Sequence, residues 1–118
     1  MTIAGQVAEA AVTDGHLLPS DAREIHAYLE SHFDRALLLL GDLTPPLLRH
    51  TRIWVARESV VCGVAGVFRG FRLPVVVVVG STEDAGARLL AECEASLDRP
   101  GILVCRTDDP IAARVERF

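Results

Sequence analysis

The sequence predicts an α/β (α+β) domain built on a mixed sheet with helices on both faces. Five consecutive valines at residues 75–79 indicate a strand that is buried on both sides. Short turns precede this strand, which favours antiparallel neighbours. A helical pattern over 81–98 leads into a second apolar run at 102–106, and such a strand–helix–strand unit normally gives a parallel pair. With 118 residues, half of them apolar, one folded domain is expected.

The N-terminal part predicts two helices after a poorly patterned start. Residues 1–14 are alanine-rich and predict a frayed helix or mobile lead-in, which leaves 15–118 as the domain. Ser20 is the expected N-cap of a first helix. A second, short apolar helix starts at Asp34 and ends where Gly41 and two prolines stop it. The apolar positions of the first helix are Ala22, Ile25, His26, Leu29 and Phe33.

Three extended segments follow. The runs 51–58 and 59–68 meet at Glu58–Ser59, a link short enough to predict a hairpin. A second turn at 69–72 leads into the valine strand, where Pro74 suits the first position. We expect Trp54 and Phe68 to pack in the core.

The last predicted elements are a helix, a strand and a terminal helix. Pro100 and Gly101 end the helix that begins after Gly80. The apolar run 102–106 then predicts the parallel strand, and residues 109–118 predict a short final helix. The apolar face of the central helix consists of Ala85, Leu89, Leu90, Cys93 and Leu97.

The turn after the valine strand is the first candidate site, because a strand that breaks at a glycine before a helix often holds phosphate. However, Ser81 and Asp84 match the spacing of a capping box, and Glu83 adds a second acid in the same turn. These groups oppose an external anion, so a self-capped helix is favoured over a ligand site. If the turn did bind a cofactor, the candidates would be Val79, Gly80, Ser81 and Gly86.

Composition excludes several chemistries. The net charge of −4 argues against nucleic acid, and the absence of lysine removes Schiff bases and phosphate-binding lysines. The spacing of the histidines does not predict a metal site, and no Ser/His/Asp arrangement predicts a nucleophile, so no catalytic residue is assigned. Asp42, after the second helix, favours a turn-capping role. The histidines are His16, His26, His32 and His50.

Cysteine usage and the absence of export signals indicate a cytoplasmic protein. Cys62, Cys93 and Cys105 all lie in apolar segments, which predicts buried thiols in a reducing compartment. The longest apolar runs are far shorter than the ~20 residues of a membrane span, and the N-terminus lacks a signal-peptide pattern.

Taken together, "IWVARESVVCGVAGVF", "LPVVVVVG", "AGARLLAECEASL" and "ILVCR" resemble the first half of the GNAT acetyltransferase superfamily. The resemblance is greatest to the GNAT-like N-terminal domains that precede a catalytic GNAT domain in some bacterial proteins. It implies the order strand, two helices, three antiparallel strands, helix, parallel strand, helix. Catalytic members bind the acetyl-CoA pyrophosphate with an (Arg/Gln)-x-x-Gly-x-(Gly/Ala) loop. Here Gly86 could match one glycine, but Glu83 would stand at the leading Arg or Gln.

The resemblance therefore implies a non-catalytic GNAT-like domain that supports assembly or substrate shaping of an acetyltransferase, with no cofactor. Two alternatives stay open: a divergent active acyl-CoA N-acyltransferase that uses acetyl-CoA, and a small-molecule sensor. A complete GNAT fold adds two strands after the final helix. We therefore expect the strand at 102–105 to form a sheet edge covered by a following catalytic domain or a homodimer partner.

Overall fold

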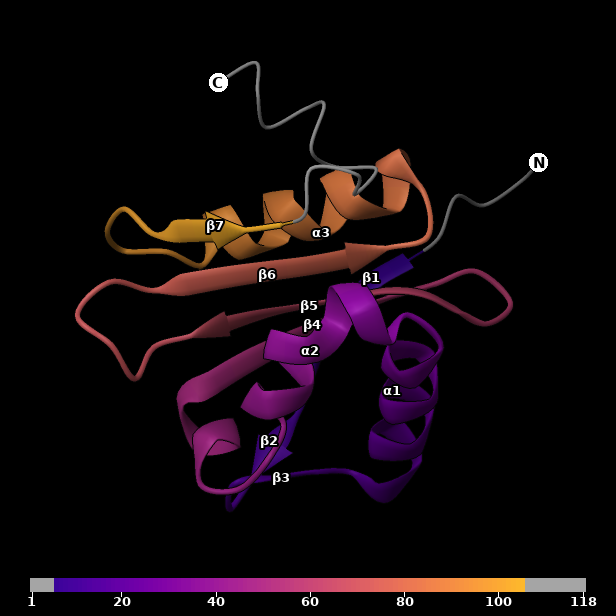
Figure 1. Ribbon diagram of the computed structural model, residues 1–118, viewed down its shortest axis with the longest axis horizontal. Helices are drawn as coiled ribbons and strands as arrows, with labels where there is room; N and C mark the ends of the chain where they lie inside the picture. Colours follow the sequence, from indigo (N-terminus) through magenta and orange to yellow (C-terminus); the bar gives the residue numbers. More distant parts are fainter. Residues whose placement is uncertain (1–5, 106–118) are drawn as a thin grey trace.

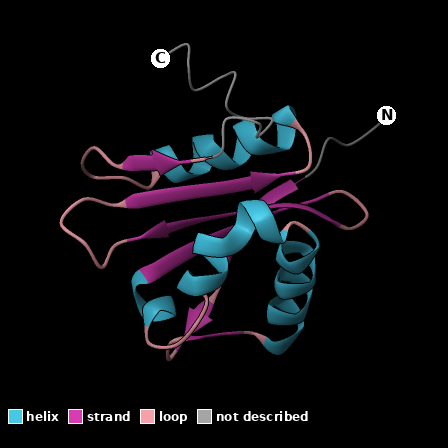
Figure 2. Cartoon of the chain, viewed as in Figure 1, coloured by secondary structure: helices cyan, strands magenta, loops and turns pink. Residues whose placement is uncertain are grey.

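The computed structural model describes residues 6–105 and contains a five-stranded mixed sheet with helices on both faces (Figures 1 and 2). The strand order is β1-β4-β5-β6-β7, in which the first four strands are antiparallel neighbours and β7 runs parallel to β6. The mixed α/β fold is thus confirmed. The sheet strands are β1 (Gln6–Ala10), β4 (Thr51–Arg57), β5 (Val61–Phe68), β6 (Val75–Gly80) and β7 (Ile102–Val104).

Two helices cover one face of the sheet and one helix covers the other (Figure 1). The helices α1 (Pro19–Ser31) and α2 (Phe33–Asp42) lie together, and α3 (Glu83–Ala95) crosses over from β6 to β7. A short 3-10 helix, η1 (Leu47–His50), leads into β4, and a separate small hairpin pairs β2 (Val12–Thr13) with β3 (His16–Leu17).

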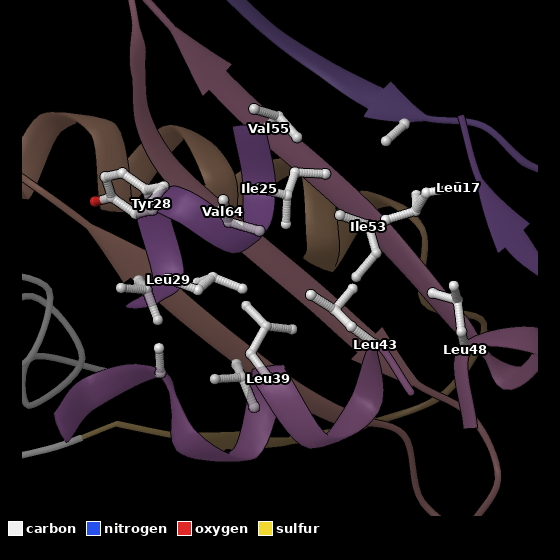
Figure 3. Packing of buried hydrophobic residues seen from close by; sticks show 14 residues of the cluster. Leu17, Ile25, Tyr28, Leu29, Leu39, Leu43, Leu48, Ile53, Val55 and Val64 are labelled. Atoms are coloured by element: carbon white, nitrogen blue, oxygen red, sulfur yellow. The ribbon is translucent and has the colours of Figure 1, made fainter. Parts of the chain in front are cut away.

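The valine strand β6 serves two hydrophobic cores at once. Val77 and Val79 pack with α1 and α2, whereas Val76 and Val78 pack with α3. Consecutive side chains of a strand point to opposite faces, so a strand that is covered on both sides needs continuous apolar sequence. The prediction of a doubly covered strand is therefore confirmed. Figure 3 shows the α1–α2 core, in which Leu29 and Leu39 face Ile53 and Val64 of the sheet.

The middle of the sheet follows the sequence-based expectation. The hairpin between β4 and β5 turns at residues 58–60, and Pro74 immediately precedes β6. Trp54 and Phe68 are both buried, as predicted. Burial of these strands on both faces explains why their apolar sequences predicted them well.

The N-terminal prediction was wrong for residues 6–14. Instead of a frayed helix or mobile lead-in, Gln6–Ala10 forms β1, which pairs with β4 from Gln6↔Arg57 to Ala10↔Ile53. Only Ala10 of this edge strand is buried, so its sequence carries little apolar pattern. The next segment forms the β2–β3 hairpin, whose turn places Asp14 at φ 54° and Gly15 at φ 77°. The domain therefore includes residues 6–14.

The start of α1 also differs from the prediction. Leu18 is the N-cap residue, no side chain caps the helix, and Pro19 occupies its first turn. Proline suits that position because it has no N–H group to satisfy, so Ser20 lies one residue inside the helix. His32 then separates α1 from α2, and Phe33 begins α2 with 57 % of its surface exposed. The predicted helix at 109–118 and residue 106 of the predicted strand lie outside the described residues.

Candidate functional site

The turn after β6 is much tighter than its sequence suggests. Only Ser81 and Thr82 separate the end of β6 from the start of α3. A Cβ atom added to Gly80 would lie 2.8 Å from the backbone nitrogen of Gly86, so the end of the strand packs directly on the first turn of the helix. The missing side chain of Gly80 is what permits this contact.

The four cofactor candidates occupy different environments. Gly80, Ser81 and Gly86 come together at the tight turn, but the Val79 side chain is fully buried in the α1–α2 core. Gly86 is buried beneath the turn, and Ser81 is exposed. The structure therefore gathers three of the four candidates, and Gly86 contributes close packing of helix and strand.

The N-cap of α3 is Thr82, not Ser81. The Thr82 Oγ1 atom accepts a hydrogen bond from the backbone N–H of Ala85 at 3.1 Å. Asp84 forms an ion pair with Arg88 at 3.2 Å, one turn further along the helix. The predicted Ser81–Asp84 capping box was therefore wrong. The cause is the β5–β6 ladder, which continues through a bond from the Ser81 N–H to the Cys62 carbonyl and so keeps Ser81 in line with the strand.

Ser81 instead joins the turn to α1. Its Oγ lies 2.8 Å from the hydroxyl of Tyr28, and that hydroxyl also donates to the Cys62 carbonyl at 3.1 Å. Figure 3 shows Tyr28 at one end of the core with its hydroxyl oxygen directed away from the aliphatic side chains. The ring of His32 stacks on Tyr28 with 4.4 Å between centroids. The polar contact of this tyrosine was not predicted from the sequence.

A second bond from the helical pair reaches the same turn. Arg35 of α2 donates from Nη1 to the Gly80 carbonyl oxygen at 3.0 Å. We use the name polar junction for Tyr28, Arg35, Cys62, Gly80 and Ser81, which tie α1 and α2 to the end of β6. The role of Arg35 could not be predicted from the sequence, because 45 residues separate it from Gly80 and no local pattern links the two.

The electrostatics of the tight turn disfavour an external anion. Glu83 and Asp84 are both exposed in the first turn of α3, where a phosphate would have to approach. The amino end of a helix attracts negative charge, and here two carboxylates already occupy that region. The Arg35 guanidinium is directed at the Gly80 carbonyl. The arrangement suits a structural link between helices and sheet better than a phosphate site.

The cysteine thiols nearby are poorly suited to nucleophilic chemistry. Burial raises the pKa of Cys93 to about 12, so its thiol stays protonated at neutral pH. Burial, and then the charge of Glu58, also raise the pKa of Cys62 above its usual range. Cys93 is buried, while Cys62 and Cys105 are half-buried, so the prediction of buried thiols holds fully only for Cys93.

The remaining sequence candidates lie apart from one another. Within residues 6–105, no three His, Cys, Asp or Glu side chains are grouped as metal ligands. Asp42 is the last residue of α2, and the Thr44 hydroxyl donates to the Gly41 carbonyl at 2.6 Å, so Thr44 makes the side-chain cap that was predicted for Asp42. None of the helices in the described part of the chain is long and apolar enough to cross a membrane.

Comparison of the chain with protein-family models, curated proteins and solved structures gives no significant match.

Proposed function

We propose that this chain is a non-catalytic GNAT-like domain that supports the assembly or substrate shaping of an acetyltransferase. Its element order over residues 6–105 is strand, two helices, three antiparallel strands, helix and parallel strand, apart from the inserted β2–β3 hairpin. That order agrees with the one the sequence resemblance implies, and β1 supplies a first strand that the sequence alone did not predict.

The tight turn between β6 and α3 is the observation that carries the non-catalytic part of the proposal. In catalytic members of the superfamily the corresponding loop wraps the pyrophosphate of acetyl-CoA. Here the connection is two residues long, and a Cβ added at Gly80 would lie 2.8 Å from the Gly86 nitrogen, so the end of the strand packs directly on the first turn of the helix. The exposed carboxylate of Glu83 adds repulsion at the same place, whereas Asp84 is paired with Arg88.

Isothermal titration calorimetry with acetyl-CoA and with free CoA tests this part. We expect no saturation below about 1 mM, because neither the shape nor the charge of the turn suits a pyrophosphate. A Glu83→Gln/Asp84→Asn variant removes the two negative charges and leaves the short connection intact, so it should also fail to bind. Saturable micromolar binding by the unaltered chain would contradict the proposal and favour the active N-acyltransferase.

The assembly part of the proposal depends on β7. Within the described residues β7 is the last strand of the sheet, and it exposes Ile102 and Val104 to 48 % and 36 %. An apolar edge strand of this kind favours pairing with another strand. The partner that we propose is a catalytic GNAT domain or a second copy of this chain.

A further inference from the structure

A polar cleft opens where β1 ends and the chain turns away from β4. After Ala10 pairs with Ile53, the chain leaves the sheet and enters the β2–β3 hairpin. Gly15 in the hairpin turn approaches Arg49 of η1, since a Cβ on Gly15 would lie 3.8 Å from the Arg49 Cβ. The resulting cleft has a volume of about 480 Å³, and its lining residues are Glu9, Ala10, Ala11, Val12, Gly15, Arg49, Thr51 and Arg52.

Two of the three charged side chains in this cleft neutralise each other. Glu9 accepts two hydrogen bonds from Arg52, at 2.8 Å from Nε and 2.7 Å from Nη2. The same bonds hold the pKa of Glu9 below its usual range. Arg52 also lies 5.0 Å above the ring of Trp54, which helps to fix its position. Arg52 therefore brings little net charge to the cleft.

Arg49 is the uncompensated charge. Its side chain is exposed, and it forms no ion pair or side-chain hydrogen bond with any residue between 6 and 105. A guanidinium group presents parallel N–H donors that match the two oxygens of a carboxylate. The cleft thus combines one unpaired planar cation with small apolar side chains from Ala10, Ala11 and Val12.

We propose that this cleft binds a small monocarboxylate with an apolar body, whose carboxylate pairs with Arg49. A volume of about 480 Å³ falls in the range of small-molecule sites. The net charge of the lining is +1, from two arginines and one glutamate. A dianion such as phosphate would therefore be only half neutralised and would lie close to Glu9, whereas a single carboxylate is matched.

Amide chemical shifts of the ¹⁵N-labelled chain during titration with benzoate test the proposal. Benzoate combines a carboxylate with a flat apolar ring, and benzamide has the same shape without the charge. We expect saturable shifts at Gly15, Arg49 and Thr51 with a dissociation constant of about 1 mM, as weak single-anion sites give. Benzamide should bind at least tenfold more weakly. Equal affinity for the two compounds would overturn the role of the carboxylate.

Three variants test whether the positive charge of Arg49 binds the carboxylate. Arg49→Gln should weaken benzoate binding tenfold or more, and Arg49→Lys should recover only part of it, because an ammonium lacks the paired donors. Arg99→Gln removes an equal charge from the α3–β7 link and serves as the control, with no change expected. Unchanged affinity in Arg49→Gln, with a spectrum that shows an intact fold, would overturn the proposal.

The variant Glu9→Gln should change the affinity for benzoate in the opposite direction. It releases Arg52 from its partner and raises the charge of the cleft, so benzoate should bind about threefold more tightly. Weaker binding would contradict the charge assignment. Inorganic phosphate should bind more weakly than benzoate to the unaltered chain, and the reverse order would overturn the choice of a monocarboxylate.

Discussion

The hydroxyl of Tyr28 lies 2.8 Å from the Oγ of Ser81, although 53 residues separate the two in the chain. Through this contact α1 is joined to the turn that follows the valine strand. A bond from Arg35 to the Gly80 carbonyl joins α2 to the same turn. The end of β6 is thus held in place from the helical face, which supports its interpretation as a rigid structural corner.

The first prediction is that Tyr28 and Ser81 are energetically coupled. Tyr28→Phe and Ser81→Ala should each lower the free energy of unfolding by about 1 kcal/mol, the usual net worth of a hydrogen bond. The loss stays moderate because the Cys62 carbonyl keeps its bond from the Ser81 N–H. In urea unfolding, the double variant should lose about 0.5–1 kcal/mol less than the sum of the two.

Thr82→Ala is the matched control for this cycle. It should also lose about 1 kcal/mol, because Thr82 caps α3, but its loss should add to that of Tyr28→Phe. Coupling of Tyr28 to Thr82 instead of Ser81 would show that the tyrosine acts through the helix cap.

Two neighbouring residues with hydroxyl groups explain why the N-cap of α3 was predicted wrongly. Ser81 and Thr82 are both good N-cap residues, and the local spacing favoured Ser81. The choice between them is made by the ladder with β5, where Gly80 pairs with Gly63 and the Ser81 N–H bonds to Cys62. That pairing depends on residues of another strand, so a local pattern could not predict it.

The central elements were predictable because the spacing of their apolar residues along the chain indicates which side chains are buried. The valines of β6 and the apolar face of α3 each indicate their own environment without knowledge of the rest of the chain. β1 was missed because an edge strand with one buried residue has no such periodicity. The polar junction was missed for another reason: its contacts join α1 and α2 to a distant strand end, and their partners are backbone carbonyls in two cases.

The second prediction concerns two glycines with opposite roles. Gly80→Ala should lower the free energy of unfolding by about 2–3 kcal/mol, since the new Cβ would lie 2.8 Å from the backbone of Gly86, which cannot rotate away. Gly41→Ala should raise it by about 0.5 kcal/mol, because that residue lies in α2 with nothing within 4 Å of its Cβ position. Thermal or urea unfolding measures both. A Gly80→Ala variant as stable as the parent would mean that the turn is loose enough to open.

The third prediction is a pH dependence that originates at Asp42. Burial raises the pKa of this carboxyl to about 6, above its usual value of 3.8. The folded chain therefore holds the proton more tightly than the unfolded chain. The stability contribution of Asp42 is fully present below about pH 4 and is lost as the pH rises through about 6.

Asp42→Asn should therefore stabilise the chain at pH 7 by about 1 kcal/mol, a figure reduced for the solvent screening of a half-buried group. The gain should vanish below about pH 4, where both side chains are neutral. Glu30→Gln, an exposed position on α1, is the control for the general effect of removing negative charge. Urea unfolding from about pH 4 to about pH 8 gives the comparison, and an equal gain at both ends would contradict the assignment to Asp42.

The last prediction concerns the edge of the sheet. β7 pairs with β6 through only three residues, Ile102 to Val104, and its two outward apolar side chains are exposed. The strand has no charge or proline between these residues, so it lacks the usual features that prevent strands from pairing between molecules. We expect the chain to associate at high micromolar concentration, measured by size-exclusion chromatography with light scattering.

Val104→Lys places a charge on the edge and should shift the population to monomer. Val60→Lys changes a more exposed valine, 70 % accessible in the β4–β5 turn, and should leave association unchanged. If the parent chain stays monomeric while the amides of 102–105 are protected from hydrogen exchange, the edge is already satisfied within the chain and the assembly part of the proposed function is wrong.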